Sequence, residues 1–225
     1  MRIVVLTGAG LSAESGLATF RASDGLWEQH RVEDVATPQA FRRDPALVMR
    51  FYDARRVGAA KAEPNPAHQA LARLSRQPGV TLITQNVDAL LDRAGAQDVI
   101  HMHGRLDSAL CAACGHRWPA PVTMPVGMAC PLCGRPEARP DIVWFGEMPY
   151  HMDRIEAALD RADLFAAIGT SGNVYPAAGF VDVAAMNGAE TVELNLAATA
   201  PGRFDRVIEG PASRTVPDWV ASLIG

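Results

Sequence analysis

Short apolar runs recur along the chain, and each of them ends at a small or polar residue. Runs of this length that are apolar at nearly every position are typical of strands buried on both faces of a parallel sheet. We therefore predict strands at residues 2–7, 80–84, 98–102, 141–145, 163–168 and 191–195.

Helical patterns lie between these runs. Asn65 followed by Pro66 predicts the start of a helix that extends to about residue 76, because Asn caps helices and Pro suits their first turn. Further helices are expected at residues 87–94, 152–162, 177–187 and 219–224. Strands that alternate with helices predict an α/β fold with a Rossmann-like, doubly wound parallel sheet, in which ligands bind at the carboxyl ends of the strands.

Two stretches interrupt this alternation. Residues 27–61 have a mostly helical pattern, and residues 105–138 are rich in Gly, Pro and Cys. We interpret them as a helical insert and a smaller second insert, which pack together beside the sheet of a single catalytic domain. Residues 1–26, 62–104 and 139–225 then form the Rossmann-like part.

Bulk composition narrows the class of protein. The chain has 225 residues, of which 48% are hydrophobic and 20% are charged, as in an ordinary globular protein. Its net charge of −4 argues against a dedicated nucleic-acid surface, which would form a basic stripe. No apolar run is long enough to span a membrane, and the run at residues 3–6 is too short for a signal peptide, so we expect a cytoplasmic protein.

The four cysteines form two pairs, Cys111-x-x-Cys114 and Cys130-x-x-Cys133, which are separated by fifteen residues. Two such pairs suit a zinc ion held by four thiolates, a closed tetrahedral site that is structural rather than catalytic. The alternative is four free cysteines, while disulfides are not expected in a cytoplasmic protein. We therefore predict that the insert at residues 105–138 binds one structural Zn²⁺.

The first predicted strand leads directly into Gly8-Ala9-Gly10-Leu11-Ser12-Ala13, a Gly-x-Gly-x-x-Ala sequence. Glycines in this position let the backbone approach a pyrophosphate, whose oxygens then accept from backbone N–H groups. The alternative is a glycine-rich turn without a ligand. A dehydrogenase would also need a second strand that ends in an acidic residue, whereas residues 19–27 predict a loop, so a bound dinucleotide is not expected to carry hydride.

Two further motifs follow predicted strands. Gln85-Asn86-Val87-Asp88 offers an amide and a carboxylate that can hold a carboxamide and a water, although helix capping is an equal alternative. His101-Met102-His103-Gly104 places a histidine at a strand end, where its near-neutral pKa suits a general base. The alternatives are a structurally satisfied histidine or a metal ligand, and nothing nearby supplies further ligands for a metal.

Taken in order, these motifs resemble the sirtuin family, the NAD-dependent protein lysine deacylases, over essentially the whole chain. The matching segments are Gly8-Ala9-Gly10-x-Ser12-x-Glu14-Ser15-Gly16, Thr19-Phe20-Arg21, Gln85–Asp88, His103-Gly104, the cysteine pairs, Arg139-Pro140-x-x-Val143-Trp144-Phe145-Gly146-Glu147, Gly169-Thr170-Ser171 and Val174–Ala177.

This resemblance implies an enzyme that consumes NAD as a co-substrate and releases free lysine, nicotinamide and O-acyl-ADP-ribose. It makes His103 the general base and Asn86 and Asp88 its catalytic partners. It assigns NAD contacts to Gly8, Ala9, Gly10, Ser12, Glu14, Ser15, Thr19, Phe20, Arg21, Trp27, Gln85, Asn86, Asp88, Gly169, Thr170, Ser171, Asn195 and Ala212. The substrate peptide is expected to pair as an added strand with the backbone of Val143, Trp144, Phe145 and Gly146.

The resemblance also implies a subclass. Ala36-Thr37-Pro38 and Phe51-Tyr52-Asp53-Ala54-Arg55 are similar to the branch that removes succinyl and malonyl groups, in which the Tyr and Arg bind the acyl carboxylate. Tyr52 and Arg55 lie three residues apart and so share a helix face, while the small Ala36 leaves room for a longer acyl chain. The alternative is an amphipathic helix in which Tyr52 is half in the core and Arg55 is solvated.

Acylated lysine side chains of proteins or peptides are therefore the expected partners of a monomeric enzyme that removes succinyl, malonyl and acetyl groups. Two other functions stay open at this point: mono-ADP-ribosylation of proteins, and a catalytically silent NAD-sensing module. The joint presence of His103, Asn86 and Asp88 argues against the silent module, because such a protein could lose any of them.

Overall fold

The computed structural model describes residues 1–18, 26–27 and 30–225. The predicted cofactor residues Thr19, Phe20 and Arg21 lie outside the described residues, and the side chain of Trp27 is likewise not described. No helix among the described residues is long and apolar enough to cross a membrane.

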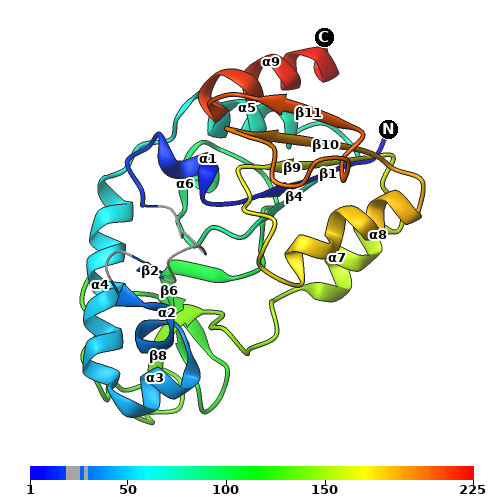
Figure 1. The fold of residues 1–225 in the computed structure, drawn as a ribbon. Coiled ribbons are helices and arrows are strands. Elements are labelled where there is room, and N and C mark those ends of the chain that lie inside the picture. Colours follow the sequence, from blue (N-terminus) through cyan, green and yellow to red (C-terminus); the bar gives the residue numbers. More distant parts are fainter. Residues whose placement is uncertain (19–25, 28–29) are drawn as a thin grey trace.

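A six-stranded parallel sheet forms the larger part of the molecule (Figure 1). Its strand order is β11-β10-β9-β1-β4-β5, so the chain starts in the middle and winds outward in both directions. The strands are β1 (Ile3–Thr7), β4 (Val80–Thr84), β5 (Ile100–His101), β9 (Leu164–Ile168), β10 (Glu190–Asn195) and β11 (Arg206–Glu209). All residues of β1 and β9 are buried, as expected for central parallel strands, and the predicted fold class is confirmed.

Helices cover both faces of this sheet, because successive side chains of a strand point to opposite faces. Ile3 and Val5 pack in one core cluster with residues of helices α5 and α9, whereas Val4 and Leu6 pack in a second cluster with residues of α7 and α8. The helices of the two layers are α1 (Gly10–Ala13), α5 (Pro66–Leu74), α6 (Leu90–Arg93), α7 (Met152–Leu159), the 3₁₀ helix η1 (Ala177–Gly179), α8 (Phe180–Met186) and α9 (Ala212–Ile224).

Helix α5 begins where the sequence predicts it. The side chain of Asn65 accepts from the backbone N–H of Ala67 (2.9 Å), and the backbone N–H of Asn65 donates to Nδ1 of His68 (3.2 Å). Pro66 occupies the first turn, where a missing N–H costs nothing. This reciprocal cap also fixes the ring of His68, which is completely buried and faces the glycine-rich segment.

A smaller module lies beside the sheet (Figure 1). Its helices pack against a three-stranded antiparallel sheet of order β7-β6-β8, around a core that includes Phe51, Tyr52, Leu106 and Trp144. The elements are a β2–β3 pair (Leu26–Trp27 with His30–Arg31), α2 (Val32–Val35), α3 (Pro38–Arg43), α4 (Pro45–Lys61), β6 (Gly104–Cys111), β7 (Arg117–Pro119) and β8 (Ala138–Ile142). Met49 of α4 shares a core cluster with Ala109 of β6, so the helical and cysteine-bearing stretches pack on one another.

The predicted strand at residues 141–145 is wrong in its place and its bounds. The strand is Ala138–Ile142, and it pairs with β6 in the small antiparallel sheet instead of joining the parallel sheet. The apolar run continues past its end because Ile142 and Trp144 are both buried in the core of the small module. Residues 143–146 therefore leave the sheet as a loop, which reaches the functional site described below.

Other predicted bounds also shift. The strand at residues 98–102 shortens to Ile100–His101, and the helix at 87–94 shortens to Leu90–Arg93. The last helix begins at Ala212 and contains Pro217, which makes it longer than predicted. The edge strand β11 was not predicted, because its residues are mostly exposed and give no apolar run.

Candidate functional site

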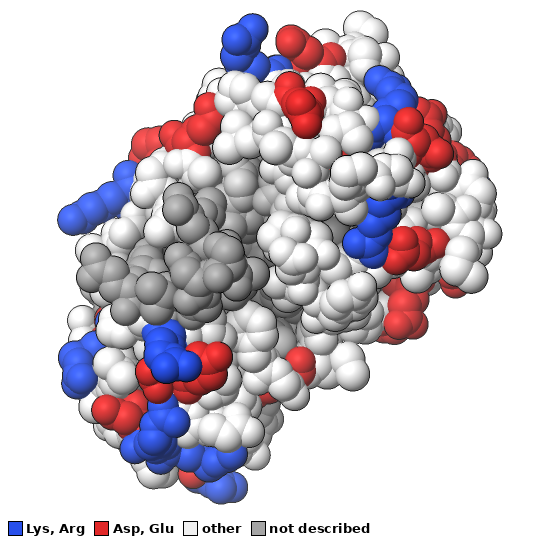
Figure 2. All heavy atoms as spheres, in the orientation of Figure 1, with Lys and Arg blue, Asp and Glu red and all other residues white. Residues whose placement is uncertain are grey.

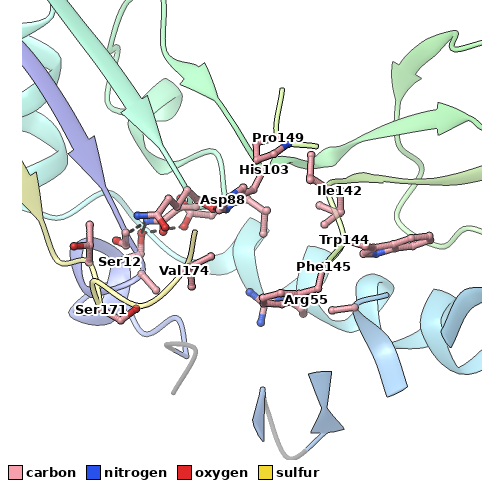
Figure 3. Close-up of a pocket in the computed structure, with 18 of the residues that line it drawn as sticks. Ser12, Arg55, Asp88, His103, Ile142, Trp144, Phe145, Pro149, Ser171 and Val174 are labelled. Atoms are coloured by element: carbon pink, nitrogen blue, oxygen red, sulfur yellow. Dashed lines mark hydrogen bonds between the residues drawn. The ribbon is translucent and has the colours of Figure 1, made fainter. Parts of the chain in front are cut away.

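A cavity of about 350 Å³ opens at the carboxyl ends of β1, β4 and β9, between the large sheet and the small module (Figure 3). Most of the predicted site residues line it, although they come from distant parts of the chain. These lining residues are Gly8, Ala9, Gly10, Ser12, Ala36, Tyr52, Arg55, Gln85, Asn86, Asp88, His103, Val143, Trp144, Phe145, Gly146, Gly169, Thr170 and Ser171.

The glycines of the first loop allow two loops to touch. A Cβ atom on Gly8 would lie 2.8 Å from the carbonyl oxygen of Gly169, and one on Gly10 would lie 2.8 Å from the Cα atom of Gly169. The N–H of Gly10 donates to the same carbonyl at 2.9 Å. Glycine is thus required at both positions for packing, and the packing places the backbone of residues 8–10 and 169–171 on one wall of the cavity.

A chain of hydrogen bonds joins the polar residues at this wall. Asn86 donates from Nδ2 to Oγ of Ser12 (3.1 Å) and to the carbonyl of Gly8 (3.0 Å). The hydroxyl of Ser12 in turn donates to Oδ2 of Asp88 at 2.9 Å (Figure 3). Burial raises the pKa of Asp88, and the N–H of Leu90 and the Ser12 hydroxyl oppose that rise. The network therefore fixes the orientation of the Asn86 amide and the Asp88 carboxyl.

His68 completes this network from behind the cavity wall. Its Nδ1 accepts the backbone N–H of Asn65, so the ring proton of the neutral form lies on Nε2, which is 3.3 Å from Oγ of Ser12. Burial lowers the pKa of His68 to about 4, which keeps the ring uncharged at neutral pH. His68 is thus a neutral donor to Ser12, a part that the sequence patterns did not reveal.

His103 faces the same cavity with its tautomer fixed by the backbone. Nδ1 lies 3.2 Å from the carbonyl oxygen of Gln85, which can only accept, so Nδ1 carries the proton and Nε2 has a free lone pair. Burial lowers the pKa of His103, and the bond to Gln85 opposes this only in part. A neutral imidazole with an unprotonated Nε2 is the form that a general base requires.

The neighbouring histidine has a different environment. His101 places Nε2 3.0 Å from Oδ2 of Asp92, and the other carboxylate oxygen, Oδ1, accepts from Arg105 at 2.8 Å. His101 does not line the cavity. The two histidines are therefore not a metal pair, and in the described part of the chain the cysteines form the sole candidate metal cluster.

Tyr52 and Arg55 reach the opposite side of the cavity from helix α4, together with Ala36. Tyr52 is completely buried, and its hydroxyl oxygen accepts from Nε1 of Trp144 at 3.1 Å. Burial raises the pKa of Tyr52 far above its ordinary value, so the hydroxyl keeps its proton. Nε and Nη1 of Arg55 are also buried. Tyr52 is thus both a core residue and a cavity residue, and the guanidinium of Arg55 does not simply extend into solvent.

Three of the four backbone donors of the loop at residues 143–146 are already engaged. The N–H groups of Val143, Trp144 and Phe145 donate to the carbonyl of His103 (2.9 Å), the carboxylate of Glu147 (2.8 Å) and the carbonyl of Ala36 (2.9 Å), respectively. An added peptide strand could therefore not use these three donors. It would have to pair with carbonyl oxygens of the loop or with the N–H of Gly146.

Among the predicted cofactor residues that the structure describes, four do not line the cavity: Glu14, Ser15, Asn195 and Ala212. The Glu14 carboxylate accepts from the backbone N–H (2.9 Å) and hydroxyl (2.7 Å) of Ser213, next to Ala212 at the start of α9. Ser15 accepts from Asn65 at 3.1 Å, and Asn195 donates to the carbonyl of Thr170 at 2.8 Å. In the structure these side chains support the loops of the wall, and their contact with NAD stays a prediction.

Comparison with known proteins decides the family. The model of the Sir2 family matches residues 8–176, which include the cavity and the cysteine pairs. The chain belongs to the Sir2 family.

The Sir2 relatives match the chain almost from end to end. The NAD-dependent protein deacylase of Bdellovibrio bacteriovorus is 54% identical over 229 residues, which cover 99% of this chain and 96% of that protein. The NAD-dependent protein deacylase of Escherichia coli K12 is 54% identical over 231 residues, with coverage of 99% and 82%. A solved Sir2 homolog–NAD complex has a TM-score of 0.89 and 40% identity, and the match covers 99% of this chain and 89% of that one.

The cysteine cluster of this Sir2 chain fits a zinc ion. All four Sγ atoms lie within 4.8 Å of one another, with Cys111 3.7 Å from Cys133 and Cys114 3.8 Å from Cys130. A tetrahedral Zn²⁺ with Zn–S bonds of about 2.3 Å separates its sulfur ligands by about 3.8 Å. The cluster lies at the far end of the eight-residue strand β6, which starts next to His103, so it is roughly 20 Å from the cavity. The site is therefore structural.

The cavity also has lining residues that the sequence motifs do not predict as site residues. They are Leu17, Ala18, Val87, Ile142, Glu147, Pro149, Val174 and Tyr175. Half of them, Ala18, Val87, Ile142 and Glu147, directly adjoin predicted residues, so adjacency was the signal available for these four. The charged groups on the face drawn in Figure 2 are interspersed in sign rather than gathered in a stripe.

Proposed function

We propose that this chain is an NAD-dependent protein lysine deacylase. The observation that carries the proposal is the pairing of His103 Nδ1 with the carbonyl of Gln85, which leaves a basic Nε2 in a cavity shared with Asn86 and Asp88. Its relatives named NAD-dependent protein deacylase support the same activity.

The cavity suits NAD because one wall consists of backbone and small residues while the adjacent network offers a fixed amide and carboxyl. When bound, NAD supplies an ADP-ribosyl group whose bond to nicotinamide is broken as the acyl-lysine amide oxygen attacks. Residues 8–10 and 169–171 hold the phosphates and ribose, and Asn86 with Asp88 holds the nicotinamide end. His103 accepts a ribose hydroxyl proton at Nε2. As the acyl group moves to the ribose hydroxyl, one water molecule is consumed, and free lysine, nicotinamide and O-acyl-ADP-ribose leave.

We propose that the acyl groups include succinyl, malonyl and acetyl. The support comes from three residues that line the cavity together: Tyr52, Arg55 and the small Ala36. A guanidinium fork pairs with a carboxylate, and a phenol can donate a further hydrogen bond. An acetyl group leaves these contacts unused, whereas a terminal carboxylate fills them.

The acylated peptide pairs with the loop at residues 143–146 through the loop's carbonyl oxygens and the N–H of Gly146, since the other donors are engaged. Main-chain pairing of this kind gives affinity with little sequence preference. The zinc ion, held by the four cysteines, stabilises the small module. The proposal includes a monomeric, cytoplasmic enzyme without a nucleic-acid partner, which size measurement in solution and cell fractionation would check.

One assay tests the proposal. Purified zinc-loaded protein is given NAD and peptides of one sequence that carry acetyl-, malonyl- or succinyl-lysine, and both nicotinamide and deacylated peptide are measured. We expect NAD-dependent formation of both in equal amounts. Nicotinamide release with transfer of ADP-ribose to protein and no deacylated peptide would instead establish mono-ADP-ribosylation. Untouched NAD with every peptide would refute both.

A further inference from the structure

Trp144 has a buried side chain in a position where the sequence motifs predict only backbone contacts. Its indole is 2% exposed, packs in the core of the small module, and donates from Nε1 to the hydroxyl oxygen of Tyr52 at 3.1 Å. Figure 3 places Trp144, Phe145 and Arg55 on one side of the cavity and Ser12 and Ser171 on the other. The indole therefore belongs to the acyl-binding side.

The direction of this hydrogen bond is fixed by chemistry. An indole N–H can only donate, so the Tyr52 oxygen is the acceptor and its own hydrogen must point elsewhere. No acceptor for that hydrogen is found among the residues that the structure describes. A buried donor without a partner is unfavourable, and Tyr52 is one of the residues that line the cavity. The arrangement thus leaves one donor for a ligand in the cavity that can accept.

The charged side chains of Arg139 and Glu147 hold the Trp144 indole in place. Arg139 makes two hydrogen bonds with the Glu147 carboxylate, at 2.7 and 2.9 Å, and its guanidinium lies 3.5 Å from the centre of the Trp144 ring. The same carboxylate accepts the backbone N–H of Trp144 at 2.8 Å. The bonds to Glu147 fix the backbone, and the stacked Arg139 fixes the ring, so the rotamer of Trp144 is set before any substrate arrives.

We infer that Trp144 is a positioning residue for acyl-chain selectivity, because its N–H commits the Tyr52 hydroxyl to donate to the carboxylate of a succinyl or malonyl group. This inference rests on the proposed function and refines it. Loss of the indole N–H would free the hydroxyl to rotate, or to turn its hydrogen away from the cavity. The donor to the acyl carboxylate would weaken, while the nicotinamide side of the cavity would keep its network.

The test is a double-mutant cycle with Trp144→Phe and Tyr52→Phe. kcat/KM is measured for succinyl-, malonyl- and acetyl-lysine peptides of one sequence, and the succinyl-to-acetyl ratio is the readout. We expect Trp144→Phe to lower this ratio about ten-fold, mainly through KM, which corresponds to the loss of one hydrogen bond of about 1.4 kcal/mol. In the Tyr52→Phe background, the same change should alter the ratio less than about two-fold.

A ratio that is unchanged by Trp144→Phe, or that falls equally in both backgrounds, would overturn the inference, since Trp144 would then not act through Tyr52. If Trp144→Phe fails to fold, β-(3-benzothienyl)alanine at position 144 replaces the N–H with sulfur at the same size, and the same ratio is measured. Failure of the proposed function is distinct, because the unmodified protein would then deacylate no peptide. A protein that removes acetyl but no acidic acyl group would overturn the inference and keep the deacylase.

Discussion

Arg55→Met tests the acyl-binding side of the cavity most directly. Methionine keeps much of the length and apolar volume of the side chain but removes its charge and its donors. Arg55 lies on α4, lines the cavity, and has Nε and Nη1 buried, so an acyl carboxylate that meets it there is largely shielded from water. The substitution should therefore reduce removal of succinyl and malonyl groups far more than removal of acetyl groups.

The expected magnitude follows from the kind of bond that is lost. A hydrogen bond that involves a charged group contributes about 1.5–3 kcal/mol, which corresponds to a change of roughly ten-fold to one hundred-fold in the succinyl-to-acetyl ratio of kcat/KM. The ratio is the proper measure because Arg55 also acts on the reaction centre. Burial raises the pKa of Asp88, and the charge of Arg55 is one of the influences that oppose that rise. Both substrates share this effect, so it cancels in the ratio.

The assay is steady-state deacylation at saturating NAD, with peptides that differ only in the acyl group. Arg50→Met is the matched control, because Arg50 lies on the same helix but is exposed, and it should leave the ratio unchanged. Arg55→Lys should fall between the two, since an ammonium keeps the charge but not the fork. Equal losses for succinyl and acetyl peptides in Arg55→Met would refute the role of this guanidinium in acyl recognition.

Three further predictions concern catalysis, pH and the metal. His103→Ala should abolish turnover while the unfolding temperature and the zinc content stay the same, and substantial remaining deacylation would show that His103 is not the base. In the unmodified enzyme the pKa of His103 is lowered, so kcat/KM should fall on acidification only below pH 6.5. Because the pKa of His68 is about 4 in the folded state and about 6.5 when unfolded, the unfolded state gains its proton first, and about 2 kcal/mol of stability should disappear between pH 7 and pH 5. Urea titrations at both pH values should show this loss, and His68→Gln should flatten it. Cys111→Ser or a strong chelator should lower the unfolding temperature and release zinc, whereas a metal-free protein of equal stability would contradict the structural role.

The large sheet could be predicted from the sequence because its central strands are mostly apolar and lie between helical patterns. Ile3–Thr7 and Leu164–Ile168 are examples in which burial on both faces leaves apolar side chains at every position except the last one of the first strand, Thr7. The same criterion failed for other strands. It missed β11, whose edge position leaves its residues exposed, and it placed residues 141–145 in the wrong sheet, because burial in the small module produces the same apolar run.

For the site, local motifs predict individual residues but not the contacts between them. The motifs named Ser12, Asn86, Asp88 and Tyr52 separately, but not the bonds between them. Ser12 and Asp88 are 76 positions apart, and Tyr52 and Trp144 are 92 apart. No periodicity links such pairs, because the fold alone decides which loops meet. Trp144 was accordingly predicted to use its backbone, whereas the structure buries its side chain in the small module.

The two sides of the cavity share one physical arrangement. His103 donates a hydrogen bond from Nδ1 to a backbone carbonyl, which leaves Nε2 able only to accept, and Tyr52 accepts a hydrogen bond from the indole N–H of Trp144, which leaves its hydroxyl to donate. In each case a protein partner occupies one hydrogen-bonding position of the side chain, and this fixes whether the remaining position donates or accepts. Because these partners belong to the scaffold, no binding energy is needed to orient the groups when substrate arrives. It follows that a change of a partner such as Trp144 should alter the acyl-group selectivity of the cavity more than it alters the stability of the fold.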